Sequence, residues 1–425
     1  MNTSRGYIFL GVVLLSVFLG ARLVSLENER REIREDLIEL SLVKYGLFNI
    51  DEWKRVVTEV VTKKVEEFDL TEGNRKEMRR RINGFLTQVV NDLEGRFRKE
   101  NRGLLGSVKN VFSDFLGVFD KIKRDVPQFT EEILNFLDDK GNREDIRNYV
   151  LEKVNDYADN TFAETDYTYH DLIIAKYGFD NRADTVAALN EATTEIDARR
   201  KPYAYTLMVI FLGLIIWLIA NRPRSRLEMS AIIICSFIPL FLGVFLPMIE
   251  IDARIAEMRF QLLGEPVSFT DQVIYYKSKS ILEVVELMMV QGKPDLIAVG
   301  LLVLAFSVLF PLSKLIACML YLYRESVRES KILRFFVFKS GKWSMADVMV
   351  IAIFMSYIGF SGIISEQLNQ LEGLTQTMDI LTTNRSSLQT GFFMFTGFVL
   401  LSLMISQRIP DVISADEQTT SNAEN

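Results

Sequence analysis

The stretch Gly341-Lys342-Trp343-Ser344-Met345-Ala346-Asp347 ends a basic segment and leads into an apolar run that continues to about Ile364. It places an indole, a hydroxyl and a carboxylate where a helix enters an apolar layer. A second unusual stretch, Pro311-Leu312-Ser313-Lys314, places a charged residue well inside the preceding apolar run. An account of the function has to explain both sites.

Apolar residues are concentrated in six runs that alternate with charged segments. A helix needs about 20 apolar residues to cross the roughly 30 Å hydrocarbon layer of a membrane, and five of the runs are close to that length or longer. The sequence therefore predicts an all-α integral membrane protein with six transmembrane helices, a helical extracytoplasmic domain and small periplasmic loops. The predicted spans are 1–26, 203–220, 229–249, 296–323, 347–364 and 391–406.

The composition excludes several classes of function. Cys235 and Cys318 both lie inside apolar runs, and His170 is the single histidine, so we expect neither disulfides nor a metal site. Phosphate-binding glycine motifs and a Ser-His-Asp set are absent from the sequence, so we expect no enzyme and no cofactor. The net charge of -7 argues against binding to nucleic acid.

The first apolar run permits two interpretations. Its core is short enough for a signal peptide, but Gly20-Ala21-Arg22 places a charge where cleavage would occur. We therefore favour an uncleaved signal anchor over residues 1–26.

Residues 27–200 are charged and have apolar positions spaced three and four apart, which predicts amphipathic helices. A helical bundle is the favoured arrangement, and a coiled-coil stalk is the alternative. Two similar phrases, Val43-Lys44-Tyr45-Gly46 and Ala175-Lys176-Tyr177-Gly178, are typical of helix ends at a left-handed glycine. Further breaks are predicted at Gly73, Gly103 and Gly141.

Basic residues gather in two loops, 221–226 and 324–342. Loops rich in Arg and Lys stay on the cytoplasmic side, which predicts cytoplasmic N and C termini. Residues 27–200, 250–295 and 365–390 are then extracytoplasmic. Residues 409–425 are polar and acidic, and we expect them to form a disordered cytoplasmic tail.

The predicted loop 250–295 holds two candidate elements. Residues 258–262 alternate between apolar and polar side chains, as a strand does. Residues 280–291 have the pattern of a short amphipathic helix that lies on the membrane face.

Lys314 lies about nine residues, or about 13 Å of helix, from the cytoplasmic end of its run, near the middle of the hydrocarbon. A lysine there costs roughly 2.5 to 3.5 kcal/mol and needs a partner or a wet cavity. A functional polar site is favoured, and snorkelling of the long side chain is the alternative. Pro311 is expected to kink the helix beside the ammonium group.

Ser344 and Asp347 have the spacing of a helix cap, with Ser344 as N-cap and Asp347 as the third helical residue. Trp343 would then be an interfacial anchor. Composition alone favours this structural role for both polar residues over a functional one.

Ser356, Gly359, Gly362 and Ser365 form a series of small residues. Helices approach each other closely over such a series, so tight packing is the favoured interpretation. A groove that admits an acyl chain is the alternative.

Four motifs, in order and spacing, resemble the membrane module of the paraquat-inducible protein A family. They are Leu246-Pro247-Met248, the segment 281–287, Pro311-Leu312-Ser313-Lys314-Leu315 and the segment 341–348. The resemblance covers residues 229–408 and implies a four-helix module in the bacterial inner membrane. It also implies that the module acts together with MCE (mammalian cell entry) proteins in moving lipids across the envelope of Gram-negative bacteria.

The resemblance further implies that Ser313, Lys314, Ser344 and Asp347 serve a lipid pocket or a proton-linked cycle. A lysine and a carboxylate in a low dielectric can exchange a proton, because burial favours the neutral form of each. The chain departs from the family in having a single module and no four-cysteine zinc ribbon. The competing interpretation is a membrane-anchored sensor of envelope stress, or a scaffold, whose polar sites are structural.

Overall fold

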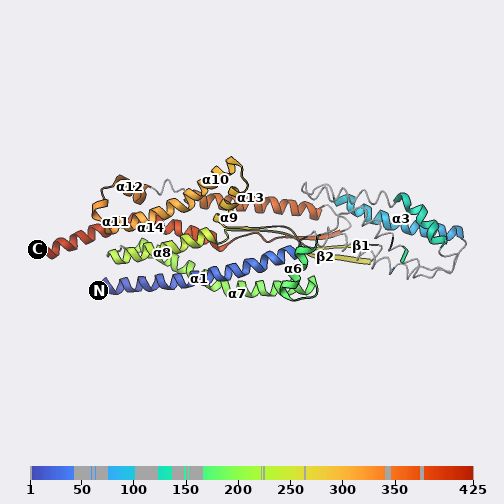
Figure 1. The fold of residues 1–425 in the computed structure, drawn as a ribbon, viewed down its shortest axis with the longest axis horizontal. Coiled ribbons are helices and arrows are strands. Elements are labelled where there is room, and N and C mark those ends of the chain that lie inside the picture. Colours follow the sequence, from blue (N-terminus) through green and yellow to red (C-terminus); the bar gives the residue numbers. More distant parts are fainter. Residues whose placement is uncertain are drawn as a thin grey trace.

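The computed structural model describes residues 2–42, 75–100, 123–135, 166–221, 225–262, 265–339, 346–373 and 378–424, together with residues 59, 63, 148, 149, 152 and 223. Over these ranges the molecule is elongated, with a bundle of long helices at one end and a sheet that projects from the bundle (Figure 1). Six described helices are long and apolar enough to cross a membrane. The prediction of a helical integral membrane protein, with six helices long and apolar enough to span a membrane, is confirmed.

The first two membrane helices, α1 (Asn2–Leu40) and α7 (Arg182–Ala220), form an antiparallel pair. The rings of Phe9 and Trp217 meet near one end, with centroids 4.9 Å apart, and Arg30 binds Asp197 toward the other. Both helices extend outward beyond the predicted spans, and Pro202 lies inside α7 without ending it. Their outer parts therefore occupy both ends of the segment predicted as a separate domain at 27–200.

The described residues between these two helices are also mainly helical. They form α3 (Arg75–Glu100), a helix over 123–135 and α6 (Thr168–Tyr177). Gly178 ends α6 with a φ of 74°, and its amide donates to carbonyls of the last turn, which confirms the predicted left-handed cap. The breaks predicted at Gly46, Gly73, Gly103 and Gly141 lie outside the described residues.

The remaining helices correspond to the other predicted spans and to short connecting helices. They are α8 (Arg226–Phe245), α9 (Ile281–Val290), α10 (Pro294–Leu304), η2 (Ala305–Leu309), α11 (Phe310–Tyr323), η3 (Glu325–Val327), α12 (Lys331–Arg334), η4 (Phe335–Lys339), α13 (Ala346–Gly373) and α14 (Thr390–Glu424). The fourth membrane span is continuous through α10, η2 and α11, because η2 is a single π-helical turn between them.

The core of the bundle is formed where α8 packs against α14. A Cβ at Gly391 would lie 2.3 Å from the carbonyl oxygen of Leu246, and one at Gly243 would lie 2.7 Å from the Cα of Phe395. Leu246 precedes a proline and therefore leaves the helical conformation, which ends α8. The carbonyl of Pro247 then accepts the amide of Gly391 at 2.9 Å.

The last helix, α14, continues over residues 409–424, in contrast to the predicted disordered tail. Ile409 and Val412 are fully buried because they extend the apolar side of α14. The guanidinium of Arg408 donates to the carbonyls of Leu218 and Ile219, at the end of α7. The first residues of the predicted tail, 409–412, are therefore packed against the bundle.

Four antiparallel strands form the sheet, in the order β2-β1-β3, with β4 also paired to β1. The strand predicted at 258–262 is confirmed, but it is the end of a much longer hairpin that fills most of the predicted loop. The strands are β1 (Ile249–Leu262), β2 (Glu265–Lys279), β3 (Met378–Asn384) and β4 (Ser387–Leu388).

The outer edge of β2 is interrupted near its middle. Asp271 has a φ of 49°, and the register of β1 against β2 shifts between Ala253 and Arg254. At this point the amide of Val273 donates to the carbonyl of Ser41, just after the end of α1. The chain leaving α1 therefore covers part of an edge that would otherwise offer free hydrogen-bonding groups.

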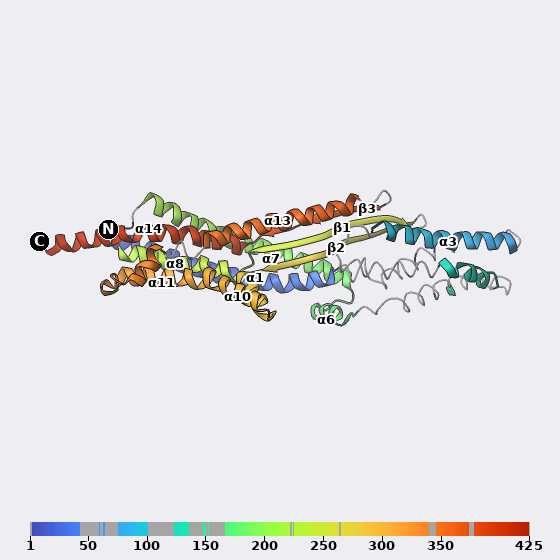
Figure 2. The same ribbon diagram turned by 90° about the horizontal axis from the view of Figure 1, so that it is seen from above.

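The sheet lies between two helical layers, with α1 and α7 on one side and α13 on the other (Figures 1 and 2). On the α1 side, Arg34 binds the carboxylates of Glu250 and Asp252. On the α13 side, the amide of Asn384 donates to Ser361 and Ser365. The sheet thus joins the first helical pair to the rest of the chain.

The predicted amphipathic helix at 280–291 is present as α9. Ser280 caps it: its hydroxyl accepts the amide of Glu283, and the Glu283 carboxylate accepts the amide of Ser280. This reciprocal capping box follows β2 directly and fixes the turn from the sheet back to the membrane.

Candidate functional site

Lys314 lies in the interior of the bundle. Its side chain is 3% exposed, and its Nζ donates to the carbonyl of Ser402 on α14 at 3.2 Å. The hydroxyl of Ser406 donates to the same carbonyl at 3.2 Å. The ammonium bonds across to a neighbouring helix rather than reaching the interface, which argues against snorkelling.

The ammonium group has more donors than this arrangement uses. It offers three N–H groups, and among the described residues one acceptor is in place. A cation in hydrocarbon is stabilised by carboxylates, by water or by an anionic ligand. The position of Lys314 therefore has capacity for a further polar partner.

The helix that carries Lys314 is irregular one turn before it. The turn η2 is π-helical, with the amide of Phe310 bonded to the carbonyl of Ala305, and Pro311 follows directly. Proline offers no amide for the helix ladder, and π turns of this kind frequently lie at functional sites. The helix thus changes type just before Pro311, and the kink predicted at Pro311 stays a prediction.

Ser307 lies within this turn and was not singled out from the sequence. Its side chain is fully buried, and its hydroxyl makes no hydrogen bond to any described residue. It lies seven residues before Lys314 in the same membrane span, and both residues are buried. The available signal was a serine, Pro311 and a lysine within eight residues of one apolar run.

The structure describes only some of the other residues predicted for the polar site. Ser313 is half-buried beside Lys314. Ser344 and Trp343 lie outside the described residues, and Asp347 is described only through its backbone, in the first turn of α13. The pairing of Lys314 with Asp347, and the cap by Ser344, therefore remain predictions.

The small residues of α13 do not form the predicted close packing within the described structure. A Cβ at Gly359 or Gly362 would meet no described atom within 4 Å. Ser365 instead accepts a hydrogen bond from Asn384 of the sheet at 3.1 Å. The glycines lie on an exposed side of the helix.

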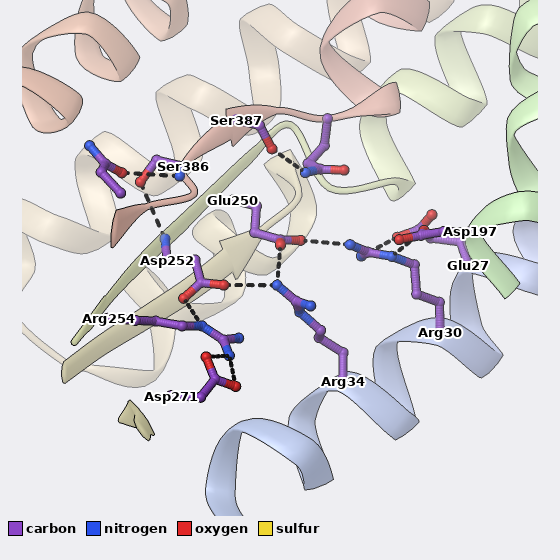
Figure 3. A network of polar contacts seen from close by, with 12 residues as sticks. Glu27, Arg30, Arg34, Asp197, Glu250, Asp252, Arg254, Asp271, Ser386 and Ser387 are labelled. Carbon is purple, nitrogen blue, oxygen red and sulfur yellow. Dashed lines mark hydrogen bonds and ion pairs between the residues drawn. The ribbon is translucent and has the colours of Figure 1, made fainter. Parts of the chain in front are cut away.

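A charged network joins the outer ends of α1 and α7 to the sheet (Figure 3). Arg30 donates to Asp197 at 2.9 Å and to Glu250 at 3.1 Å, and Arg34 donates to Glu250 at 3.0 Å and Asp252 at 2.8 Å. The network consists of Glu27, Arg30, Arg34, Asp197, Arg200, Glu250, Asp252, Arg254 and Asp271.

The two sides of the charged network are complementary. The helices α1 and α7 contribute more arginines than carboxylates, whereas the strands contribute more carboxylates than arginines. Glu250, Asp252 and Arg254 are almost completely buried, so each charge depends on its partners. Burial, followed by the charge of Glu250, raises the pKa of the adjacent Tyr276 to about 12.

Sequence reasoning missed this network. The signal was present as the alternation Ile249-Glu250-Ile251-Asp252-Ala253-Arg254-Ile255, which places charges on one face of a strand next to the membrane. The matching arginines follow the first apolar run at a spacing of one helical turn. The partners are distant in sequence, so neither pattern identifies the other.

Residues 265–369 match the family described as Paraquat-inducible protein A. The predicted resemblance is confirmed over this segment, which includes three of the four quoted motifs and leaves out the one at Pro247. A comparison with curated proteins gave no significant match, and neither did a comparison with solved structures.

Proposed function

We propose that this protein handles lipids in the bacterial inner membrane, as part of lipid transport across the envelope, with the polar site around Lys314 at its centre. The match of residues 265–369 to the paraquat-inducible protein A family supports this role. The observation that carries it is the burial of the Lys314 ammonium in an irregular membrane helix with spare donors.

In this proposal, the ammonium and the hydroxyl of Ser307 serve a polar centre in the bundle, with Asp347 as the predicted carboxylate. Transfer of a proton from the lysine to the carboxylate would neutralise both groups without changing the net charge of the site, and burial favours the two neutral forms as the site closes. The cytoplasmic loops would be the basic ones, so the sheet and the charged network would face the periplasm. An MCE-type protein there would be the partner that receives or supplies lipid.

The test is replacement of Lys314 by methionine, an unbranched side chain one atom shorter that removes the charge. We expect loss of co-purifying lipid and of envelope integrity, with expression and thermal stability retained. Lys277→Met, at an exposed position on β2, is the matched control. Wild-type behaviour of both Lys314→Met and Asp347→Asn would favour a sensor or scaffold instead.

The partner is tested separately. Co-purification of the tagged protein from its own membranes, followed by identification of bound proteins and lipids, should recover an MCE-domain protein. Recovery of lipid without such a protein would retain lipid handling and reject the partner.

A further inference from the structure

Charged residues of α7 lie at the outer end of the membrane bundle, next to the start of α14. The hydroxyl of Thr390, the first residue of α14, accepts a hydrogen bond from Arg200 at 3.1 Å. Arg199 and Lys201, on either side of Arg200, are exposed. Exposed charges are excluded from hydrocarbon by their cost, so the level of Thr390 lies at the outer surface of the membrane.

Half of α13 lies beyond this level. The ring of Phe354 is 6.4 Å from the ring of Phe392, which is in the first turn of α14. Further along, the hydroxyl of Tyr357 donates to the carbonyl of Ser386, and Asn384 binds Ser361. Figure 2 shows the helix running beside β1 and β3. From about Tyr357 onward, α13 therefore lies next to the extramembrane sheet.

This outer half remains as apolar as a membrane span. The helix has no charged residue between Val348 and Ser365. Ile358, Phe360 and Ile363 are 48%, 54% and 61% exposed. At the same level, α1 and α7 carry the arginines and carboxylates of the charged network. The exposed surface of α13 at this level therefore remains apolar, like that of a membrane span.

We propose that residues 358–364 of α13 form a surface on which the acyl chains of a phospholipid lie after they leave the bilayer. The proposal rests on the proposed function and specifies the path that a lipid takes as it leaves the membrane. The surface is continuous with Ile351 and Met355, which are exposed on the same helix nearer the membrane. A chain can therefore move along α13 without losing apolar contact.

A lipid fits this surface better than a protein partner does. Protein interfaces combine an apolar centre with a polar rim and hydrogen bonds. The polar side chains of outer α13, Tyr357, Ser361 and Ser365, are instead bonded to the sheet. The exposed side holds large apolar residues around Gly359 and Gly362, whose missing side chains leave the surface open.

Photocrosslinking to lipid tests the proposal. The photoreactive residue p-benzoylphenylalanine would replace Phe360 or Ile363 in the full chain, in cells whose phospholipids carry radioactive phosphate. We expect severalfold more radioactivity on the irradiated protein than with the same replacement at Leu172, an exposed apolar residue of α6 outside the membrane. Leu212, exposed on the apolar part of α7, is the positive control.

Two results would overturn the proposal. One is labelling at residues 360 and 363 no higher than at Leu172, and the other is a product of higher mass without radioactivity, which would identify a protein partner. Ile363→Glu is expected to reduce lipid delivery severalfold, whereas Ile363→Leu and Leu172→Glu retain it. If labelling at α13 fails while Lys314→Met still abolishes lipid loading, the route is rejected and the proposed function stands.

Discussion

Arg30 on α1 and Glu250 on β1 form an ion pair of 3.1 Å between residues that are 220 positions apart in the chain. Glu250 also accepts from Arg34, so one carboxylate joins two turns of the first helix to the first strand. This contact therefore ties the amino-terminal helical pair directly to the sheet.

Glu250→Ala is expected to destabilise the folded protein by roughly 3–5 kcal/mol, because it leaves the buried guanidinium of Arg30 and the partly buried one of Arg34 without their shared partner. Thermal unfolding in mild detergent measures the effect. The control is Arg259→Ala on the same strand, where the ion pair with Glu257 is exposed and is worth less than about 1 kcal/mol. Equal losses in the two variants would contradict the importance of the network.

Gly391→Ala is expected to destabilise the bundle by about 1–3 kcal/mol or more, since the added Cβ would lie 2.3 Å from the carbonyl oxygen of Leu246. Gly397→Ala, on the same helix, would meet no described atom within 4 Å and should be neutral or mildly stabilising. The two unfolding midpoints should therefore differ clearly. A tolerated alanine at Gly391 would show that α8 and α14 are less closely packed.

The buried Tyr276 is expected to make the folded protein less stable at alkaline pH. Its pKa is raised from 10.0 to about 12 by burial and by Glu250, so folding favours the protonated phenol. The resulting stabilisation is complete below pH 10 and is lost as the pH rises through about 12, with a maximum of about 3 kcal/mol. Tyr276→Phe should lose less stability than wild type over this interval. The same substitution at the exposed Tyr275 is the control.

Ser280→Ala removes one half of the capping box of α9 and should cost about 1 kcal/mol. Lys293 occupies the same position before α10 and makes no side-chain cap bond, so Lys293→Ala should have no such effect. Hydrogen exchange of the amides in the first turn of α9 is the sensitive measurement. Unchanged protection in Ser280→Ala would show that the contact of Glu283 with Arg31 is sufficient.

Ser307→Ala is expected to reduce lipid loading without reducing the stability of the folded protein. Its hydroxyl makes no hydrogen bond to a described residue, so its removal should leave stability unchanged or raise it by up to about 1 kcal/mol. If the hydroxyl serves the polar site of Lys314, lipid loading should nevertheless fall. Normal loading would confine Ser307 to a packing role.

The membrane helices were predictable because each apolar run carries its own signal. Lys314 was also predictable, since a charge in such a run is unusual wherever its partner lies. The outer continuation of α1 was harder to predict, because its charged residues suit either a separate domain or a longer helix. The choice between these depends on Glu250 and Asp252, which lie far away in the sequence.

The position of α13 shows a different limit of sequence reasoning. Its composition identifies a membrane span but contains no information about depth. Its depth is set by bonds from Tyr357, Ser361 and Ser365 to residues 384–386 of the sheet. Ser365 is also a member of the small-residue series, so one residue of a pattern that predicts helix packing is used here for contact with a strand.

The charged network also orders events during synthesis. Arg30 and Arg34 enter the growing chain long before Glu250 and Asp252, and until then Glu27 is the network carboxylate within one helical turn of Arg30. Asp197 on α7 also precedes β1 in the chain and supplies Arg30 with a second carboxylate. Arg34 differs, because both of its network carboxylates, Glu250 and Asp252, lie on β1. A chain interrupted before residue 250 would therefore leave Arg34 without either of them.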